Sequence, residues 1–321
     1  MCIRDRVKLV SRKINLLYYW NSDNLEKWSE IFKQKAPNIN LLNEDNCDPN
    51  EVDVALVWLP PEGFLKKFKN LKGVINLGQG VDHLLKPGIV PEKLPIIRLV
   101  DNDMSKQMSA WVSLQVLRET RFLEEYKQFE KEKKWQAVDF IPSNRWNIGV
   151  LGIGAIGKHV ALSLSNFGYN VKGWSRSKKN IDGIKCYYGE SGLHKMLVDS
   201  KILICILPLT PETKHIISKK TMSYLPDGST IINAGRGGHI NESDLLDMID
   251  NGKIKNAYLD VFETEPLPSD HIFWRHKKIN VWPHIAAETN TETSINQIID
   301  ATNCLMNNIQ PANQIDRNKG Y

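Results

Sequence analysis

Three glycines that follow a short apolar run constrain this chain more than any other feature. The run Asn147–Leu151 leads into Gly152, Gly154 and Gly157, and a helical pattern continues from Lys158 to Phe167. In a strand–turn–helix unit, the first glycine permits a tight turn and the second lets backbone N–H groups approach a pyrophosphate. The third lets the helix pack closely on the strand, and the helix N-terminus attracts the phosphates. The pattern predicts dinucleotide binding, with a plain strand-to-helix turn as the alternative.

The residues after the next apolar strand, Asn170–Trp174, indicate which dinucleotide is bound. An NAD-selective fold usually places a carboxylate there for the ribose 2′-hydroxyl, whereas an arginine accommodates a 2′-phosphate. Here the residues are Ser175, Arg176, Ser177 and Lys178, with no carboxylate among them. A guanidinium matches phosphate geometry, and a lysine adds a point charge. We therefore predict NADP(H) in preference to NAD(H). The alternative is a solvated basic loop.

Strand-like runs alternate with helical patterns along the chain, which predicts an α/β fold with parallel sheets. The expected strands of the first half are Ile14–Tyr19, Asn38–Leu42, Val52–Leu59, Leu71–Leu77 and Ile96–Val100, with a helix over Asp23–Ala36. Those after the glycine motif are Lys201–Leu207, Ser229–Asn233, Asn256–Val261 and Ile279–Trp282, with helices over Asn241–Ile249 and Thr291–Asn307. One long helix, Ser105–Lys134, is expected to connect two lobes, with its charged end exposed.

Two Rossmann-like or flavodoxin-like lobes with a cleft between them fit a chain of 321 residues. We expect a substrate-binding domain over residues 7–104 plus 287–321, and an NADP-binding Rossmann domain over residues 105–286. Residues 1–6 match no element and are left out of this scheme.

Composition excludes several classes of protein. The net charge is +5, and the 42 basic and 37 acidic residues are intermixed, so no nucleic-acid surface is expected. The five cysteines are widely spaced, which is typical of neither a disulfide framework nor a metal site and suits the cytoplasm. No apolar run reaches the roughly 18 residues of a membrane span, and no signal peptide is evident.

Three polar residues follow predicted strands in the second half: Arg236, Glu265 and His284. In open α/β sheets, ligands bind beyond the carboxyl ends of the strands. A guanidinium can clamp a substrate carboxylate, and a histidine can supply a proton to a carbonyl oxygen near neutral pH. A carboxylate on the far ring nitrogen orients the imidazole and favours its charged form. The set predicts reduction of a small 2-keto acid. Each residue by itself could instead be a surface, capping or supporting residue.

Four ordered motifs carry a family resemblance. They are Gly152–Gly157, Asn233–Gly237 (Asn-Ala-Gly-Arg-Gly), Asp260–Pro268 (Asp-Val-Phe-Glu-Thr-Glu-Pro-Leu-Pro) and Pro283–Ala287 (Pro-His-Ile-Ala-Ala). Over about residues 14–321 the chain resembles the D-isomer-specific 2-hydroxyacid dehydrogenases. The match is closest to their glyoxylate/hydroxypyruvate reductase A branch, on Trp58-Leu59-Pro60-Pro61, Leu77–Asp82 and Asp316–Tyr321.

The resemblance implies a role for each matching residue. Arg236 looks like the substrate-binding catalytic arginine, His284 like the acid/base and Glu265 like its partner. Trp58, Gly80 and Val81 look like further substrate contacts, although Trp58 could be a core residue. The implied cofactor contacts are Gly152, Gly154, Ala155, Ile156, Gly157, Leu207, Pro208, Thr213, Ala234, Gly235 and Asp260, the last of which could instead be a strand-end cap. A cytoplasmic homodimer is implied, with the helix over Ser105–Lys134 as a plausible interface.

The chain departs from the family pattern at two places. Gln79 stands where the family usually has a small residue, and Gly238, His239 and Asn241 stand where it often has a larger apolar residue and an aspartate. His239 is expected at the surface. The favoured activity is NADPH-dependent reduction of glyoxylate to glycolate or of hydroxypyruvate to glycerate. The alternatives are a dehydrogenase for a bulkier 2-keto acid, and a dinucleotide-sensing binding protein of the same fold.

Overall fold

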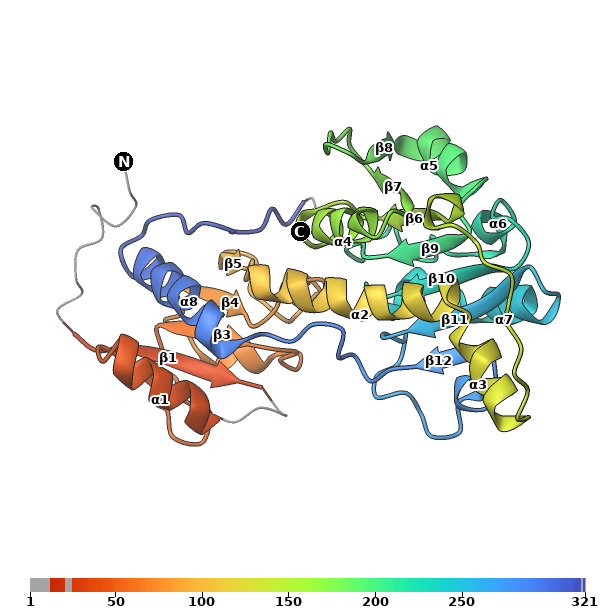
Figure 1. Ribbon diagram of the computed structural model, residues 1–321. Helices are drawn as coiled ribbons and strands as arrows, with labels where there is room; N and C mark the ends of the chain where they lie inside the picture. The colour runs from red at the N-terminus through yellow and green to blue at the C-terminus, as the bar shows by residue number, and fades with distance from the viewer. Residues whose placement is uncertain (1–11, 21–24, 319, 321) are drawn as a thin grey trace. The chain divides into compact units, whose positions relative to one another are not determined.

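The computed structural model describes residues 12–20, 25–318 and 320. The chain divides into two compact units, shown in Figure 1. Unit 1 contains the described residues up to Asp103 and from Thr289 onwards, and unit 2 contains Met104–Glu288. Residues 1–6, which the sequence analysis set aside, lie outside the described residues, as do Asp23 and Asn24 at the start of the first expected helix.

Unit 1 is built on a five-stranded parallel sheet with the strand order β2-β1-β3-β4-β5. Its elements are β1 (Ile14–Tyr19), α1 (Leu25–Lys35), β2 (Ile39–Leu42), β3 (Val54–Val57), the 3₁₀ turn η2 (Phe64–Lys67), β4 (Gly73–Asn76), β5 (Ile96–Ile97) and α8 (Thr291–Met306).

Both faces of this sheet are buried, which explains why its strands are continuous apolar runs. Successive side chains of a strand point to opposite faces. Leu16 of β1 therefore joins the core formed with α1 and α8, whereas Leu17 joins the core on the other face. In Figure 1, α8 lies in unit 1 although it comes last in the chain, and its Ile295 and Ile298 are fully buried there.

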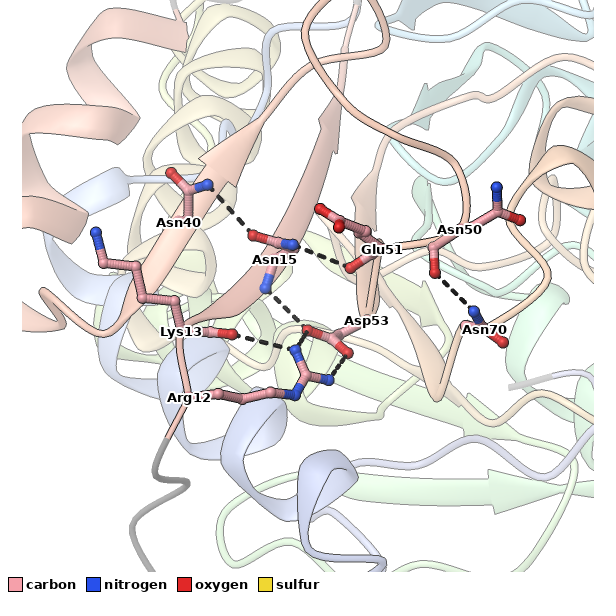
Figure 2. Close-up of polar contacts among 8 residues, drawn as sticks. All are labelled: Arg12, Lys13, Asn15, Asn40, Asn50, Glu51, Asp53 and Asn70. Atoms are coloured by element: carbon pink, nitrogen blue, oxygen red, sulfur yellow. Dashed lines mark hydrogen bonds and ion pairs between the residues drawn. The ribbon is translucent and has the colours of Figure 1, made fainter.

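A polar cluster closes the amino ends of these strands (Figure 2). Asp53, which is only 4% exposed, accepts hydrogen bonds from both terminal nitrogens of Arg12 and from the backbone N–H of Asn15 (3.0 Å). The Asn15 side chain in turn donates to the carbonyl of Glu51 (3.0 Å) and accepts from Asn40 (3.2 Å). The carboxylate of Asp53 thus forms its hydrogen bonds within unit 1, with Arg12 and Asn15. The opposite edge of the sheet is the one where ligands are expected.

Unit 2 is built on a seven-stranded parallel sheet with the strand order β12-β11-β10-β9-β6-β7-β8. Its strands are β6 (Asn147–Leu151), β7 (Asn170–Ser175), β8 (Lys185–Tyr188), β9 (Ile202–Cys205), β10 (Ser229–Asn233), β11 (Ile254–Leu259) and β12 (Ile279–Val281). Its helices are α2 (Asn102–Thr120, whose first two residues fall in unit 1), α3 (Leu123–Lys131), α4 (Ala155–Asn166), α5 (Gly189–Leu197), α6 (Lys219–Met222) and α7 (Glu242–Asp250), with 3₁₀ turns η3 (Ser143–Arg145), η4 (Gly237–His239) and η5 (Ile272–Trp274).

This second sheet is also covered on both faces. Helices α2 and α4 pack on one face, where Val112 and Val160 meet Ile148 of β6. Helices α5 and α7 pack on the other, where Met196 and Leu245 are fully buried. The predicted α/β class with parallel sheets is confirmed. Strand β8 and helices α5 and α6 were not predicted from the sequence.

The single long helix expected over Ser105–Lys134 is wrong. Two helices occupy this stretch, and between them Phe122 adopts a left-handed conformation (φ +56°) that ends the first helix. The break lets Phe122 turn towards the core, where its ring lies 6.3 Å from that of Trp146. Glu119 anchors the end of α2 by accepting hydrogen bonds from Lys255 (2.7 Å) and Asn256 (2.9 Å). The charged end of the stretch is exposed as expected, because α3 buries none of its side chains.

Candidate active site

The glycine turn lies between β6 and α4. Gly152 has φ +97°, and a Cβ there would lie 2.6 Å from the carbonyl oxygen of Ile206. A Cβ on Gly157 would lie 1.7 Å from the carbonyl oxygen of Gly152, so only glycine lets the helix approach this closely. Gly154 is different, because a Cβ there would meet no atom of the described chain within 4 Å. Two glycines are required for packing, and the third borders open space.

This turn suits a dinucleotide phosphate. Helix α4 begins at Ala155, three residues before the expected start, so the N–H groups of Ala155, Ile156 and Gly157 belong to its first turn. Such N–H groups have no partner within a helix, and no described side chain caps this end. The resulting partial positive charge, the free donors and the open space at Gly154 are what a phosphate requires. The residues present therefore fit a dinucleotide cofactor.

The other predicted cofactor residues lie along the same edge of the unit 2 sheet. Ser175 ends β7 and Arg176 to Lys178 follow it; the hydroxyl of Ser175 donates to the carbonyl of Ser177 (2.7 Å), and Arg176 is exposed. Leu207 and Pro208 follow β9, where the hydroxyl of Thr213 donates to the carbonyl of Pro208 (2.7 Å) and closes the loop. Ala234 and Gly235 follow β10. All three segments extend from the carboxyl ends of strands near β6.

Arg176 acts electrostatically on the loop that follows β9. The pKa of Glu212 is lowered, first by a hydrogen bond from Thr210 and, to a smaller extent, by the charge of Arg176. The charge of Arg176 thus contributes to the potential at the loop that follows β9.

Glu265 and His284 form a hydrogen-bonded pair. Nδ1 of His284 lies 2.7 Å from Oε2 of Glu265, and the side chains are 34% and 33% exposed, so the pair is accessible to a substrate. The other carboxylate oxygen, Oε1, accepts the backbone N–H of Phe262 (2.8 Å). Burial by itself would raise the pKa of Glu265. The hydrogen bond and charge of His284, the Phe262 N–H and the charge of Arg236 outweigh burial and leave this pKa lowered. Glu265 and His284 are thus in direct contact, and the turn after Arg236 abuts the Phe262 backbone that binds Glu265.

Asp260 holds the loop that carries His284. It is 1% exposed, and its two oxygens accept the backbone N–H groups of Ile285 (2.9 Å) and Ala286 (3.0 Å). Its carbonyl accepts the N–H of His284 (2.9 Å), which adopts φ +56°, a conformation uncommon for a non-glycine residue. Burial raises the pKa of Asp260, against the effect of these two N–H donors. These contacts are those of a strand-end cap, while a contact to the nicotinamide remains a prediction.

The backbone of Arg236 is fixed by two side chains that the sequence analysis missed or misplaced. The side chain of Asn233 donates to the carbonyl of Arg236 (2.9 Å), and Nδ1 of His239 accepts the N–H of Arg236 (3.0 Å). The surface position expected for His239 is wrong, because His239 is 0% exposed. A histidine three residues after the arginine was the available signal. Only the packing of the turn shows that its ring folds inwards.

The predicted substrate residues of unit 1 lie after β3 and β4. Trp58 packs its ring edge-on to that of His83, 4.7 Å away, and a Cβ on Gly78 would lie 2.7 Å from the Trp58 ring. The side chain of Asn76, also missed from the sequence, donates to the carbonyls of Gly78 and Gly80 (2.9 Å each). A planar trans peptide sends the next N–H in the opposite direction. The N–H groups of residues 79 and 81 therefore point away from Asn76, as an anion cradle requires.

Comparison with known proteins gives the family. Residues 113–286 match the model described as "D-isomer specific 2-hydroxyacid dehydrogenase, NAD binding domain". The chain belongs to this family. The predicted resemblance is confirmed, and the chain is accordingly an oxidoreductase with a nicotinamide dinucleotide-binding domain.

Individual members of the dehydrogenase family are similar over nearly the whole chain. A glyoxylate/hydroxypyruvate reductase A from Serratia proteamaculans is 38% identical over 96% of this chain and 100% of its own length. A crystal structure of a D-isomer specific 2-hydroxyacid dehydrogenase from Xanthobacter autotrophicus, in complex with NADPH and MES, has a TM-score of 0.91 at 35% identity. It covers 96% of this chain and 100% of that one. An NADPH-dependent glyoxylate/hydroxypyruvate reductase from Sinorhizobium meliloti, in complex with NADP and sulfate, has a TM-score of 0.89 at 29% identity, with the same coverage.

Among the described residues, no helix combines the length and the apolar character that crossing a bilayer would require.

Proposed function

We propose that this chain reduces small 2-keto acids with NADPH, with glyoxylate and hydroxypyruvate as the preferred substrates. The observation that carries the proposal is the Glu265–His284 hydrogen bond beside Arg236, at the carboxyl edge of the sheet that holds the glycine turn. The Serratia and Sinorhizobium relatives are named for this activity, which supports the choice of substrates.

The chain's own residues would divide the reaction as follows. The N–H groups of the glycine turn would hold the dinucleotide, and the chemistry that it would supply when bound is a hydride for the carbonyl carbon. Arg236 binds the substrate carboxylate through its guanidinium fork. Glu265 holds Nδ1 of His284, which leaves Nε2 to donate a proton to the carbonyl oxygen as negative charge develops there. Hydride and proton together convert the keto group to a hydroxyl. Trp58, Gly80 and Val81 of unit 1 remain proposed as further substrate contacts.

A preference for NADP(H) rests on residues 175–178, at the end of β7 and just after it. Arg176 and Lys178 are exposed cations, and two serine hydroxyls flank Arg176. This stretch contains no carboxylate, so nothing in it would repel a 2′-phosphate. The Xanthobacter and Sinorhizobium structures were solved with NADPH and NADP.

The test is to mix the protein with NADPH and a 2-keto acid and to follow the nicotinamide absorbance. We expect faster loss of signal with glyoxylate and hydroxypyruvate than with aromatic or branched 2-keto acids, and faster loss with NADPH than with NADH. A higher kcat/KM for a bulky keto acid would assign the chain to another branch of the family. NADPH binding without reduction of any keto acid would favour a dinucleotide-sensing protein.

We also propose a homodimer in the cytoplasm. Most of the apolar residues of α2 that suggested an interface pack inside unit 2, although Leu114 is exposed. We therefore place the interface on residues 123–141. There α3 buries no side chain, and Trp135 and Phe140 are exposed.

The proposed compartment is supported by four free thiols, as a reducing environment allows: Cys47, Cys186, Cys205 and Cys304.

We expect sedimentation to give twice the mass of the chain, and Trp135→Glu to shift it towards the monomer. A monomeric wild-type protein would contradict this proposal.

A further inference from the structure

A buried histidine holds the backbone of the proposed substrate-binding arginine. His239 ends the 3₁₀ turn η4, three residues after Arg236, and none of its surface is exposed. Its Nδ1 accepts the N–H of Arg236 at 3.0 Å. The ring lies against Gly235, where a Cβ would come within 2.9 Å of it. A glycine at position 235 is therefore needed to seat this ring beneath the turn.

This contact determines which ring nitrogen carries the proton. A backbone N–H can only donate, so Nδ1 must be the acceptor and can carry no proton. The ring is then neutral, with its proton on Nε2, because a charged imidazole has donors at both nitrogens. The two histidines therefore have different roles. His284 is proposed to donate a proton to the substrate, whereas Nδ1 of His239 must remain a hydrogen-bond acceptor.

Further contacts hold the carbonyl side of Arg236 and the turn that follows it. The carbonyl of Arg236 accepts hydrogen bonds from the Asn233 side chain (2.9 Å) and from the N–H of His239 (3.2 Å). A Cβ on Gly237 would lie 1.8 Å from the carbonyl carbon of Phe262, so the turn abuts the backbone that binds Glu265. The peptide groups on both sides of Arg236 are thus held, and with them the direction in which its side chain leaves the chain.

We propose that His239 is a positioning residue for Arg236, acting through the Nδ1 acceptor of its neutral ring. Its consequence for catalysis rests on the proposed function, since that function makes Arg236 the group that binds the substrate carboxylate. Without the acceptor, the Arg236 N–H loses its partner and the turn relaxes. A displacement of about 1 Å in a positioning group can cost roughly 10²-fold in rate.

Two variants separate the acceptor from the bulk of the ring. In His239→Asn, the side-chain oxygen replaces Nδ1 as the acceptor, at the same number of bonds from the backbone. In His239→Leu, an apolar side chain fills the space of the ring but offers no acceptor. We expect His239→Leu to lower kcat/KM for glyoxylate by roughly 10- to 100-fold, mainly through a higher KM for the keto acid. The KM for NADPH should change by less than about two-fold, and His239→Asn should recover most of the loss.

Thr221→Val is the matched control. Oγ1 of Thr221 accepts the N–H of Ser218 (2.9 Å) with the same three-residue spacing, in a different turn of unit 2. This variant should leave the KM for the keto acid unchanged. An equal rise of that KM in Thr221→Val and His239→Leu would show a general loss of structure and overturn the proposal. So would a His239→Asn variant as impaired as His239→Leu.

A double-mutant cycle tests whether His239 acts through Arg236. On an Arg236→Ala background, His239→Leu should have almost no further effect on kcat/KM, because the positioned group is absent. An undiminished effect would overturn the proposal.

A measurement that does not depend on turnover distinguishes this inference from the proposed function. In the two-bond ¹⁵N–¹H spectrum of the imidazoles, the signal of His239 is assigned as the one that disappears in His239→Asn. This signal should show a proton on Nε2 of His239 and none on Nδ1. A proton on Nδ1 overturns the inference even if the enzyme reduces glyoxylate. A wild-type protein that shows the Nε2 proton but reduces no keto acid would contradict the function and leave the hydrogen bond established.

Discussion

We expect His284→Ala to lower the kcat for glyoxylate reduction by about 10²-fold or more, the scale of lost general acid catalysis. The side chain pairs with Glu265 at 2.7 Å and is about one-third exposed, so it is both oriented and accessible. The KM for NADPH should change little, since His284 is assigned to the proton and not to the dinucleotide. Steady-state kinetics with saturating NADPH gives both quantities.

The chain offers a matched control for His284. His276 also pairs with a carboxylate, that of Asp250 (3.4 Å), in the same unit but away from the carboxyl ends of the strands. His276→Ala should keep wild-type turnover. Glu265→Gln should give an intermediate loss, because the amide can still contact Nδ1 but lacks the negative charge of the carboxylate. Unchanged turnover in His284→Ala would remove this residue from the mechanism.

The second large effect is expected on cofactor selectivity. Arg176→Ala should raise the KM for NADPH by roughly 10- to 100-fold, which corresponds to one lost charge-assisted interaction. The KM for NADH should change by less than about three-fold, because NADH has no 2′-phosphate for the guanidinium to bind. Initial rates with each dinucleotide at saturating glyoxylate measure the two values.

Two further variants sharpen the assignment of Arg176. Arg176→Lys keeps the charge but loses the planar fork, so it should fall between the wild type and Arg176→Ala. Arg275→Ala removes an exposed arginine of the same unit and controls for a general change in charge. Equal effects of Arg176→Ala on NADPH and NADH would contradict binding of the 2′-phosphate.

Several local features could be predicted from the sequence because their causes lie within a few residues. The strand Ser229–Asn233 has its expected bounds. Asn241 caps α7, since its side chain accepts the N–H of Asp244 (3.1 Å), three residues further along the chain. The glycine turn was recognisable because its three glycines are closely spaced between one strand and one helix, and Gly157 packs against the carbonyl of Gly152 within that unit. In each case the amino-acid pattern and its physical cause are close together in the chain.

Other features depend on residues far apart in the chain. The helix break at Phe122 has no glycine or proline to mark it, and it forms because Phe122 meets Trp146 and because Lys255 and Asn256 hold Glu119. The Asn76 amide that shapes the loop after β4 is an ordinary strand residue in the sequence. The contacts of Asp260 with residues 285 and 286 are equally invisible in a linear pattern.

The sequence by itself determined the α/β class, the family and the glycine turn, and it indicated Arg236, Glu265 and His284 as the proposed catalytic residues. It could do so because strand periodicity and motif spacing are local, and because the carboxyl ends of parallel strands meet at one edge. Only the tertiary structure decided how the arginine and the histidine are held, through the Nδ1 of the buried His239, the amide of Asn233 and the carboxylate of Asp260. Those contacts depend on burial and on hydrogen bonds between side chains and turn backbone, which form only once the turns have packed against the sheet.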